Sequence, residues 1–93
     1  MAIEVRFPSD VLRKHTGGAK LVQGSGETLD DLLADLDTRH AGLRAKLVDD
    51  SGLRRFVNIY LNDEDVRHLD GLKTPLKDGD TVIVLPAVAG GTL

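Results

Sequence analysis

The residue types that most often carry chemistry are present in this 93-residue chain, but their spacing forms no familiar site. His15, His40 and His68 stand far apart and lack the i, i+4 helical spacing, with a glutamate between, of a common zinc site. The acidic run at residues 63–65 lacks the glycine and the closing glutamate of a calcium loop. We interpret the histidines as surface residues, the acidic run as a solvated turn, and predict no metal site.

Nucleophilic and phosphate-binding chemistry is equally hard to assemble. Ser9, Ser25 and Ser51 have no nucleophile-elbow motif around them. The Gly-Ser-Gly stretch at residues 24–26 precedes a predicted helix, yet it lacks the glycine spacing and the lysine of a phosphate-binding loop. The chain contains no cysteine, which excludes disulfides, iron–sulfur centres and thiol catalysis. We therefore predict that the chain is not itself an enzyme and binds no cofactor.

The carboxyl-terminal residues, LPAVAGGTL, offer a different kind of chemistry. After Pro86 the composition changes to alanine, valine and glycine without a pattern to bury, so residues 87–93 are predicted to form a tail. Gly90 and Gly91 lack β-carbons and adopt backbone angles that other residues avoid. Such a segment can pass through a narrow channel where a side chain would not fit. Any chemistry of this tail must therefore involve its backbone.

The element with the clearest pattern is a helix in the stretch GSGETLDDLLADLDTRH. Four leucines at i, i+3, i+4 and i+7 form one stripe, which predicts an amphipathic helix that covers one face of a sheet. Thr28 is the predicted N-cap, and Gly42 the predicted stop. The members of the stripe are Leu29, Leu32, Leu33 and Leu36.

Short alternating and apolar runs predict the strands. Residues 3–7 and 19–23 form a predicted hairpin around a loop at residues 9–18. Residues 56–61 form a well-covered strand, and Val66 a short edge strand. The most apolar run, residues 81–86, is expected at the centre of the sheet. Residues 42–53 are ambiguous, since Leu43 and Leu47 could make a helical turn beneath the sheet.

This order of elements predicts an α+β fold of the β-grasp, or ubiquitin-like, type. A mixed sheet of four to five strands would carry one main helix, with the first and last strands side by side in the middle. Residues 1–86 would form a single domain, and residues 87–93 its tail. A tail that leaves a central strand is anchored at one end.

Composition limits the partners and the compartment. The formal charge of −3 argues against nucleic acid, which requires a concentrated basic patch. No segment is apolar enough to cross a membrane, and the start MAIEVRFPSD does not have the apolar run of a signal peptide. We expect a cytoplasmic protein that binds neither nucleic acid nor membrane.

Four stretches together resemble the ThiS/MoaD family of sulfur carriers: ETLDDLLADL, FVNIYLNDEDVR, DGDTVIVLP and the terminal AVAGG. The resemblance covers nearly the whole chain, and RFVNIYLNDEDVR with LPAVAGG is closest to the CysO-type carriers of cysteine biosynthesis. It implies that an E1-like adenylating enzyme activates the terminal carboxylate of Gly91 with ATP. A sulfur donor then converts it to a thiocarboxylate, while Gly90, Ala89 and Val88 thread into partner sites.

The resemblance also implies an acceptor enzyme, such as a pyridoxal-phosphate-dependent cysteine synthase or another sulfur-inserting biosynthetic enzyme. Gly91 is joined to Thr92, so its carboxylate is not free. Removal of Thr92 and Leu93, for example by a zinc metalloprotease, would free it. These two residues could otherwise be a remnant of cloning, or mark a protein that has lost the carrier role.

Docking affinity must come from the globular part, because ordering a tail costs about 1–2 kcal/mol per residue. Phe56, Ile59 and Leu61 are candidate docking residues, although apolar residues of this kind more often pack in the core. Two other functions remain open: a ubiquitin-like modifier conjugated through Gly91, and a binding module whose tail is inert.

Overall fold

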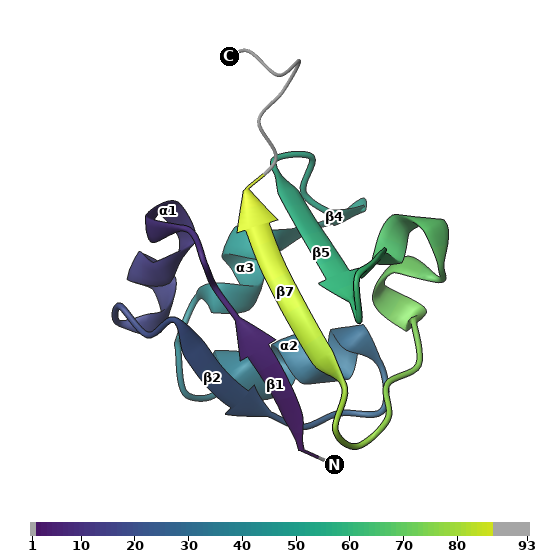
Figure 1. Cartoon of the computed structure of the whole chain (residues 1–93). Coiled ribbons are helices and arrows are strands. Elements are labelled where there is room, and N and C mark those ends of the chain that lie inside the picture. Colours follow the sequence, from purple (N-terminus) through teal and green to yellow (C-terminus); the bar gives the residue numbers. More distant parts are fainter. Residues whose placement is uncertain (1, 87–93) are drawn as a thin grey trace.

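The computed structural model describes residues 2–86, which fold around a five-stranded mixed sheet (Figure 1). The strand order is β2-β1-β7-β5-β6, so the last strand lies at the centre, as predicted. The strands are β1 (Ile3–Arg6), β2 (Leu21–Gly24), β5 (Val57–Leu61), β6 (Glu64–Asp65) and β7 (Thr81–Pro86).

The first and last strands pair in parallel at the middle of the sheet, and every other pairing in the sheet is antiparallel. Val5 of β1 lies opposite Val82 of β7, and Val84 of β7 lies opposite Ile59 of β5. All four side chains are fully buried. The predicted β-grasp arrangement is therefore confirmed, with its two terminal strands side by side.

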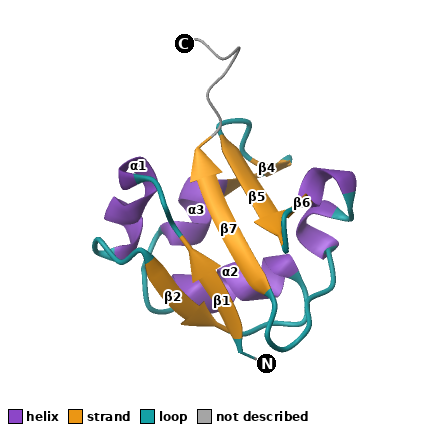
Figure 2. Cartoon of the chain, in the orientation of Figure 1, coloured by secondary structure: helices purple, strands orange, loops and turns teal. Residues whose placement is uncertain are grey.

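One main helix, α2 (Leu29–Asp37), lies across one face of the sheet (Figure 2). Its leucine stripe is buried completely, as the spacing predicted. Thr28 caps the helix, since its hydroxyl accepts a hydrogen bond from the backbone N–H of Asp31 at 3.2 Å. The helix ends at Asp37, earlier than the predicted stop at Gly42.

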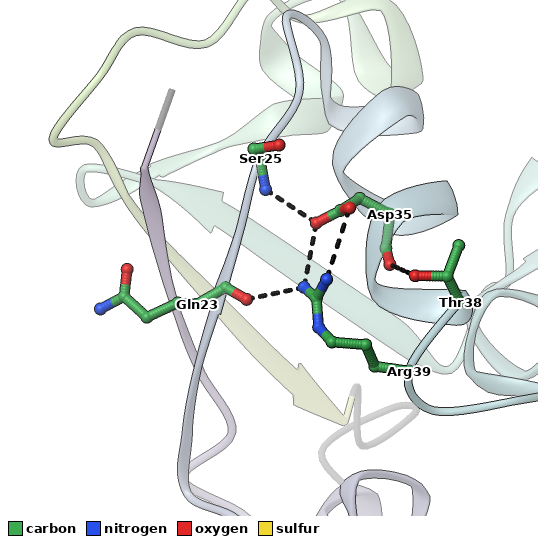
Figure 3. A network of polar contacts seen from close by, with 5 residues as sticks. All are labelled: Gln23, Ser25, Asp35, Thr38 and Arg39. Carbon is green, nitrogen blue, oxygen red and sulfur yellow. Dashed lines mark hydrogen bonds and ion pairs between the residues drawn. The ribbon is translucent and has the colours of Figure 1, made fainter.

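A polar network fastens the end of α2 to strand β2 (Figure 3). The carboxylate of Asp35 accepts hydrogen bonds from Arg39 and from the backbone N–H of Ser25, both at 2.9 Å. Arg39 also donates to the carbonyl of Gln23 at 2.8 Å. The hydrogen bond from Arg39, followed by that from Ser25, lowers the pKa of Asp35 below its ordinary value of 3.8, although burial opposes the shift.

Two of the sequence predictions are wrong in detail. The segment predicted as a loop at residues 9–18 contains a short helix and a 3-10 turn, α1 (Asp10–Arg13) and η1 (Lys14–Thr16). Val66 is fully buried, but it begins the 3-10 turn η2 (Val66–His68) instead of forming an edge strand. The edge strand is β6, which uses acidic residues predicted as turn.

The remaining elements are short. The ambiguous segment does form a helical turn, α3 (Leu43–Leu47), whose two leucines are buried. The small hairpin of β3 (Val48–Asp49) and β4 (Gly52–Leu53) follows, and η3 (Gly71–Lys73) precedes the loop that leads into β7.

Candidate functional site: the open sheet face and the end of the last strand

The last described residue, Pro86, ends a strand that is held on both sides. It lies opposite Val57 of β5, while β1 pairs with the other edge of β7. Any chain that continues from Pro86 therefore starts from the central strand of the sheet, which is paired along both edges. The predicted tail residues Val88, Ala89, Gly90, Gly91 and Thr92 all lie outside the described residues.

Of the three apolar residues considered for docking, only Phe56 is exposed. Its relative exposure is 52%, and it immediately precedes Val57, the residue that pairs with Pro86. It therefore lies beside the point where β7 ends. An exposed aromatic ring there suits contact with a partner protein.

Ile59 and Leu61 lie on the face of the sheet that α2 covers, so their side chains are directed toward the core. Ile59 is fully buried, so its candidacy as a docking residue is wrong. Leu61 is half-buried, lies opposite Val82 and packs against the core. Both side chains therefore stabilise the fold, in agreement with the expectation that apolar residues of this kind more often pack in the core.

The sheet face that α2 leaves uncovered carries a row of three apolar or aromatic residues and one arginine that sequence reasoning missed. Leu21, Arg6, Ile83 and Tyr60 lie opposite one another, in that order, across β2, β1, β7 and β5. Directly paired residues share one face of a sheet, and here that face is opposite the buried valines. Leu21 is 49% exposed, while Ile83 and Tyr60 are half-buried. Strand alternation could have revealed them, once the face of one strand was fixed.

The Gly-Ser-Gly stretch has a packing role in place of a phosphate-binding one. A β-carbon on Gly26 would lie 2.5 Å from the backbone nitrogen of Leu32, and one on Gly24 would lie 2.6 Å from the Leu32 Cδ1 atom. Gly26 therefore has no room for a side chain, because the backbone of α2 lies against it, whereas a side chain at Gly24 would require the Leu32 side chain to shift. The N–H of Ser25 is already bonded to Asp35, so it is not available to an anion.

No group of three or more potential ligands within the described part of the chain could hold a metal ion. The acidic run contributes to a tight turn between β5 and β6, in which both Asn62 and Asp63 have positive φ. The Asn62 amide donates to Asp80 and its oxygen accepts from the N–H of Thr81, both at 3.0 Å. These contacts assign the turn a structural role.

The family is decided by a match over most of the chain. A model described as the ThiS family matches residues 6–91. This chain belongs to the ThiS family. The match ends at Gly91, and it includes strands β2, β5, β6 and β7, the helix α2 and the di-glycine. The predicted resemblance to the ThiS/MoaD carriers is therefore confirmed.

Two relatives cover nearly the whole chain. The chain is 51% identical over 94 residues to the sulfur carrier protein CysO of Mycobacterium tuberculosis strain H37Rv, with 98% of this chain and 100% of the relative covered. It is 50% identical, with a TM-score of 0.87, to a chain in the crystal structure of the Amycolatopsis orientalis BexX/CysO complex, with 96% of this chain and 99% of that chain covered.

A third relative is named as a modifier protein and not as a sulfur carrier. Small archaeal modifier protein 3 of Haloferax volcanii is 44% identical over 64 residues, which are 69% of this chain and 70% of the relative. The family match and the CysO relatives support a role for this chain as a small ubiquitin-like sulfur carrier. In the described part of this ThiS-family chain, no helix is both long and apolar enough to cross a membrane.

Proposed function

We propose that this protein carries sulfur as a thiocarboxylate at the carboxyl end of Gly91. After Thr92 and Leu93 are removed, the Gly91 carboxylate attacks the α-phosphorus of ATP on an adenylating enzyme and releases pyrophosphate. A sulfide equivalent then attacks the acyl carbon and displaces AMP, which leaves the C(O)SH group. The chain supplies the acyl group and the docking surface, while its partners supply the catalysis.

The observation that carries this proposal is the family match that ends at the second glycine, residue 91. The position of β7 supports it, because a tail that starts at Pro86 from a central strand has a fixed origin. Ordering the tail in a partner costs about 1–2 kcal/mol per residue. The open sheet face, with the Leu21 to Tyr60 row and nearby Phe56, is the surface that offsets this cost.

The acceptor is proposed to be a biosynthetic enzyme that inserts sulfur. The chain's 51% identity to CysO favours a pyridoxal-phosphate-dependent cysteine synthase. Its similarity to a chain of the BexX/CysO complex supports an acceptor enzyme that binds the carrier protein directly. We further propose that a peptidase, such as a zinc metalloprotease, cleaves between Gly91 and Thr92.

The second candidate function is a ubiquitin-like modifier that ends on a lysine amine of another protein. The 44% identity to a small archaeal modifier protein favours it. It uses the same activation at Gly91, so the product distinguishes the two functions. Lysine-linked adducts indicate the modifier, and sulfur transferred to a small molecule indicates the carrier.

Intact mass spectrometry tests the proposal. A chain that ends at Gly91 is incubated with ATP, sulfide and a competent adenylating enzyme, beside the same chain with Thr92 and Leu93 retained. We expect the shorter chain to gain the mass difference between sulfur and oxygen, and the longer chain to gain it only after a peptidase has acted. If the chain ending at Gly91 acquires no sulfur, the proposal is wrong.

A further inference from the structure

A groove of about 430 Å³ opens on the sheet face beside the end of β1. Its lining residues come from the short helix α1, strands β1, β2 and β7, and the loops that follow β1 and precede β2. Figure 1 shows α1 beside the end of the sheet where β7 finishes. The lining residues are Arg6, Pro8, Arg13, Lys20, Leu21 and Ile83. Three of them, Arg6, Leu21 and Ile83, belong to the row across the open sheet face, and Leu21 and Ile83 are its apolar members in the groove.

The charge of this groove is opposite to that of the whole chain. Three of its lining residues, Arg6, Arg13 and Lys20, are cations, and none of the described residues that line it is acidic. The chain as a whole has a formal charge of −3. Glu4 bonds only the Nε of Arg6, at 2.5 Å, and no described residue bonds the two terminal nitrogens of this guanidinium group. The groove is therefore a local basic site in an acidic protein.

The walls of the groove are held in place by hydrogen bonds. Arg13 donates from Nε to the carbonyl of Phe7 at 2.9 Å and from a terminal nitrogen to the carbonyl of Pro8 at 2.5 Å. The N–H of Phe7 donates to the carbonyl of Lys20 at 2.7 Å. These bonds tie α1, the end of β1 and the start of β2 together. A preformed site loses little conformational freedom when it binds.

The combination of charge and exposed apolar surface limits what the groove fits. A small anion alone would leave Leu21, which is 49% exposed, in water. A membrane would require a broad apolar patch and a basic protein, and this chain is acidic. A polypeptide that presents a carboxylate next to an apolar side chain satisfies both parts of the groove.

We propose that the groove binds an acidic segment of the acceptor enzyme, with carboxylates against Arg6 and Lys20 and an apolar side chain on Leu21 and Ile83. This step rests on the proposed function, because an enzyme that receives a tail starting at Pro86 covers the adjoining end of the sheet. The contact would orient the carrier and accelerate its association with an acidic partner surface.

The test measures binding of a probe peptide to the full-length, ¹⁵N-labelled protein by NMR. The probe is acetyl-DELLDE-amide, and its matched control is the neutral analogue acetyl-NQLLNQ-amide. We expect the amide signals of Lys20, Leu21 and Ile83 to shift in a saturable manner with the acidic peptide. Raising the salt concentration should weaken this binding, since exposed charges are screened.

Charge reversal in the groove supplies the decisive comparison. Arg6→Glu and Lys20→Glu should each weaken binding of the acidic peptide by about tenfold. Lys46→Glu makes the same charge change at an exposed position of α3, away from the groove, and should have little effect. Each variant's fold is checked by its own NMR spectrum.

Three outcomes would overturn the proposal: shifts that map outside the groove, equal binding of the neutral peptide, or equal weakening by Lys46→Glu. A further titration uses inorganic phosphate alone. Identical signal shifts with phosphate would also overturn the proposal, because they would show that the groove is a simple anion site. Because no step uses Gly91, the peptide result is independent of sulfur loading. Failure here and failure of the carrier function are thus separate results.

Discussion

Asp35 joins three segments of the chain through one carboxylate. It bonds the side chain of Arg39 one turn along and the backbone of Ser25 at the end of β2, while Arg39 continues to the Gln23 carbonyl. The Asp35 side chain is 30% exposed, so solvent screens its ion pair with Arg39. The backbone bond to Ser25 is the part of the network that sets the position of β2 against α2.

This network predicts a pH-dependent contribution to stability. Because the folded state lowers the pKa of Asp35, the stabilisation is complete above the ordinary value of 3.8 and is lost as the pH falls through the folded value. Asp35→Asn should reduce the free energy of unfolding by about 1 kcal/mol at pH 7, with the difference narrowing below about pH 4. Urea denaturation of both proteins across this range measures it.

Asp50→Asn is the matched control, because the Asp50 side chain is exposed and forms no hydrogen bond or ion pair with another described residue. Its unfolding free energy should stay within about 0.5 kcal/mol of the wild type at every pH. A constant difference between Asp35→Asn and the wild type down to the lowest pH would show that the carboxylate's charge is irrelevant.

At the scale of the element, the junction between β2 and α2 depends on a close approach at Gly26. A methyl group there meets the backbone of Leu32, which belongs to the helix and cannot rotate away. Gly26→Ala should therefore lower the free energy of unfolding by about 1–3 kcal/mol, a cost typical of overpacking. Ser25→Ala, one residue earlier and exposed, should cost under about 0.5 kcal/mol. Equal stability of the two variants would show that the junction adjusts freely.

Elements with a repeated pattern were predictable from the sequence. The leucine stripe of α2 extends over nearly two turns, and β7 is an almost entirely apolar run, so both were predicted correctly. The short helix α1 has only four residues, too few for a helical period to emerge. A single buried valine, Val66, is equally compatible with a strand and with a 3-10 turn, which is why the predicted edge strand was wrong.

The open sheet face was harder to predict because apolar residues are adjacent in two strands. Leu21 and Val22 follow one another, as do Tyr60 and Leu61, and the alternation rule does not say which member faces the core. The register decides: Val22 lies opposite buried Val5, so Leu21 faces outward. The tail residues were singled out by composition and family resemblance, and their role stays a prediction.

At the scale of the whole molecule, the sheet separates residues that form the core from residues that we propose to meet a partner. Ile59→Ala should cost about 2–5 kcal/mol of unfolding free energy, because it leaves a cavity in the core. Phe56→Ala should change that free energy by under about 0.5 kcal/mol and yet slow sulfur loading of the chain that ends at Gly91.

Thermal denaturation and the mass-spectrometric loading assay together measure this separation. Leu69→Ala is the control for Phe56→Ala, since Leu69 is also an exposed large apolar residue but follows η2 instead of adjoining the end of β7. Loading that is slowed equally by both substitutions would remove Phe56 from the proposed docking surface.

The parallel pairing of β1 with β7 also determines how the folded domain responds to mechanical force. A partner that pulls on the end of β7, while the start of β1 is restrained, slides two adjacent parallel strands past each other. In that geometry the hydrogen bonds between them are strained together, whereas a hairpin pulled open at its ends loses its bonds one at a time. A domain with this strand pairing is expected to resist unfolding when force is applied through the end of β7.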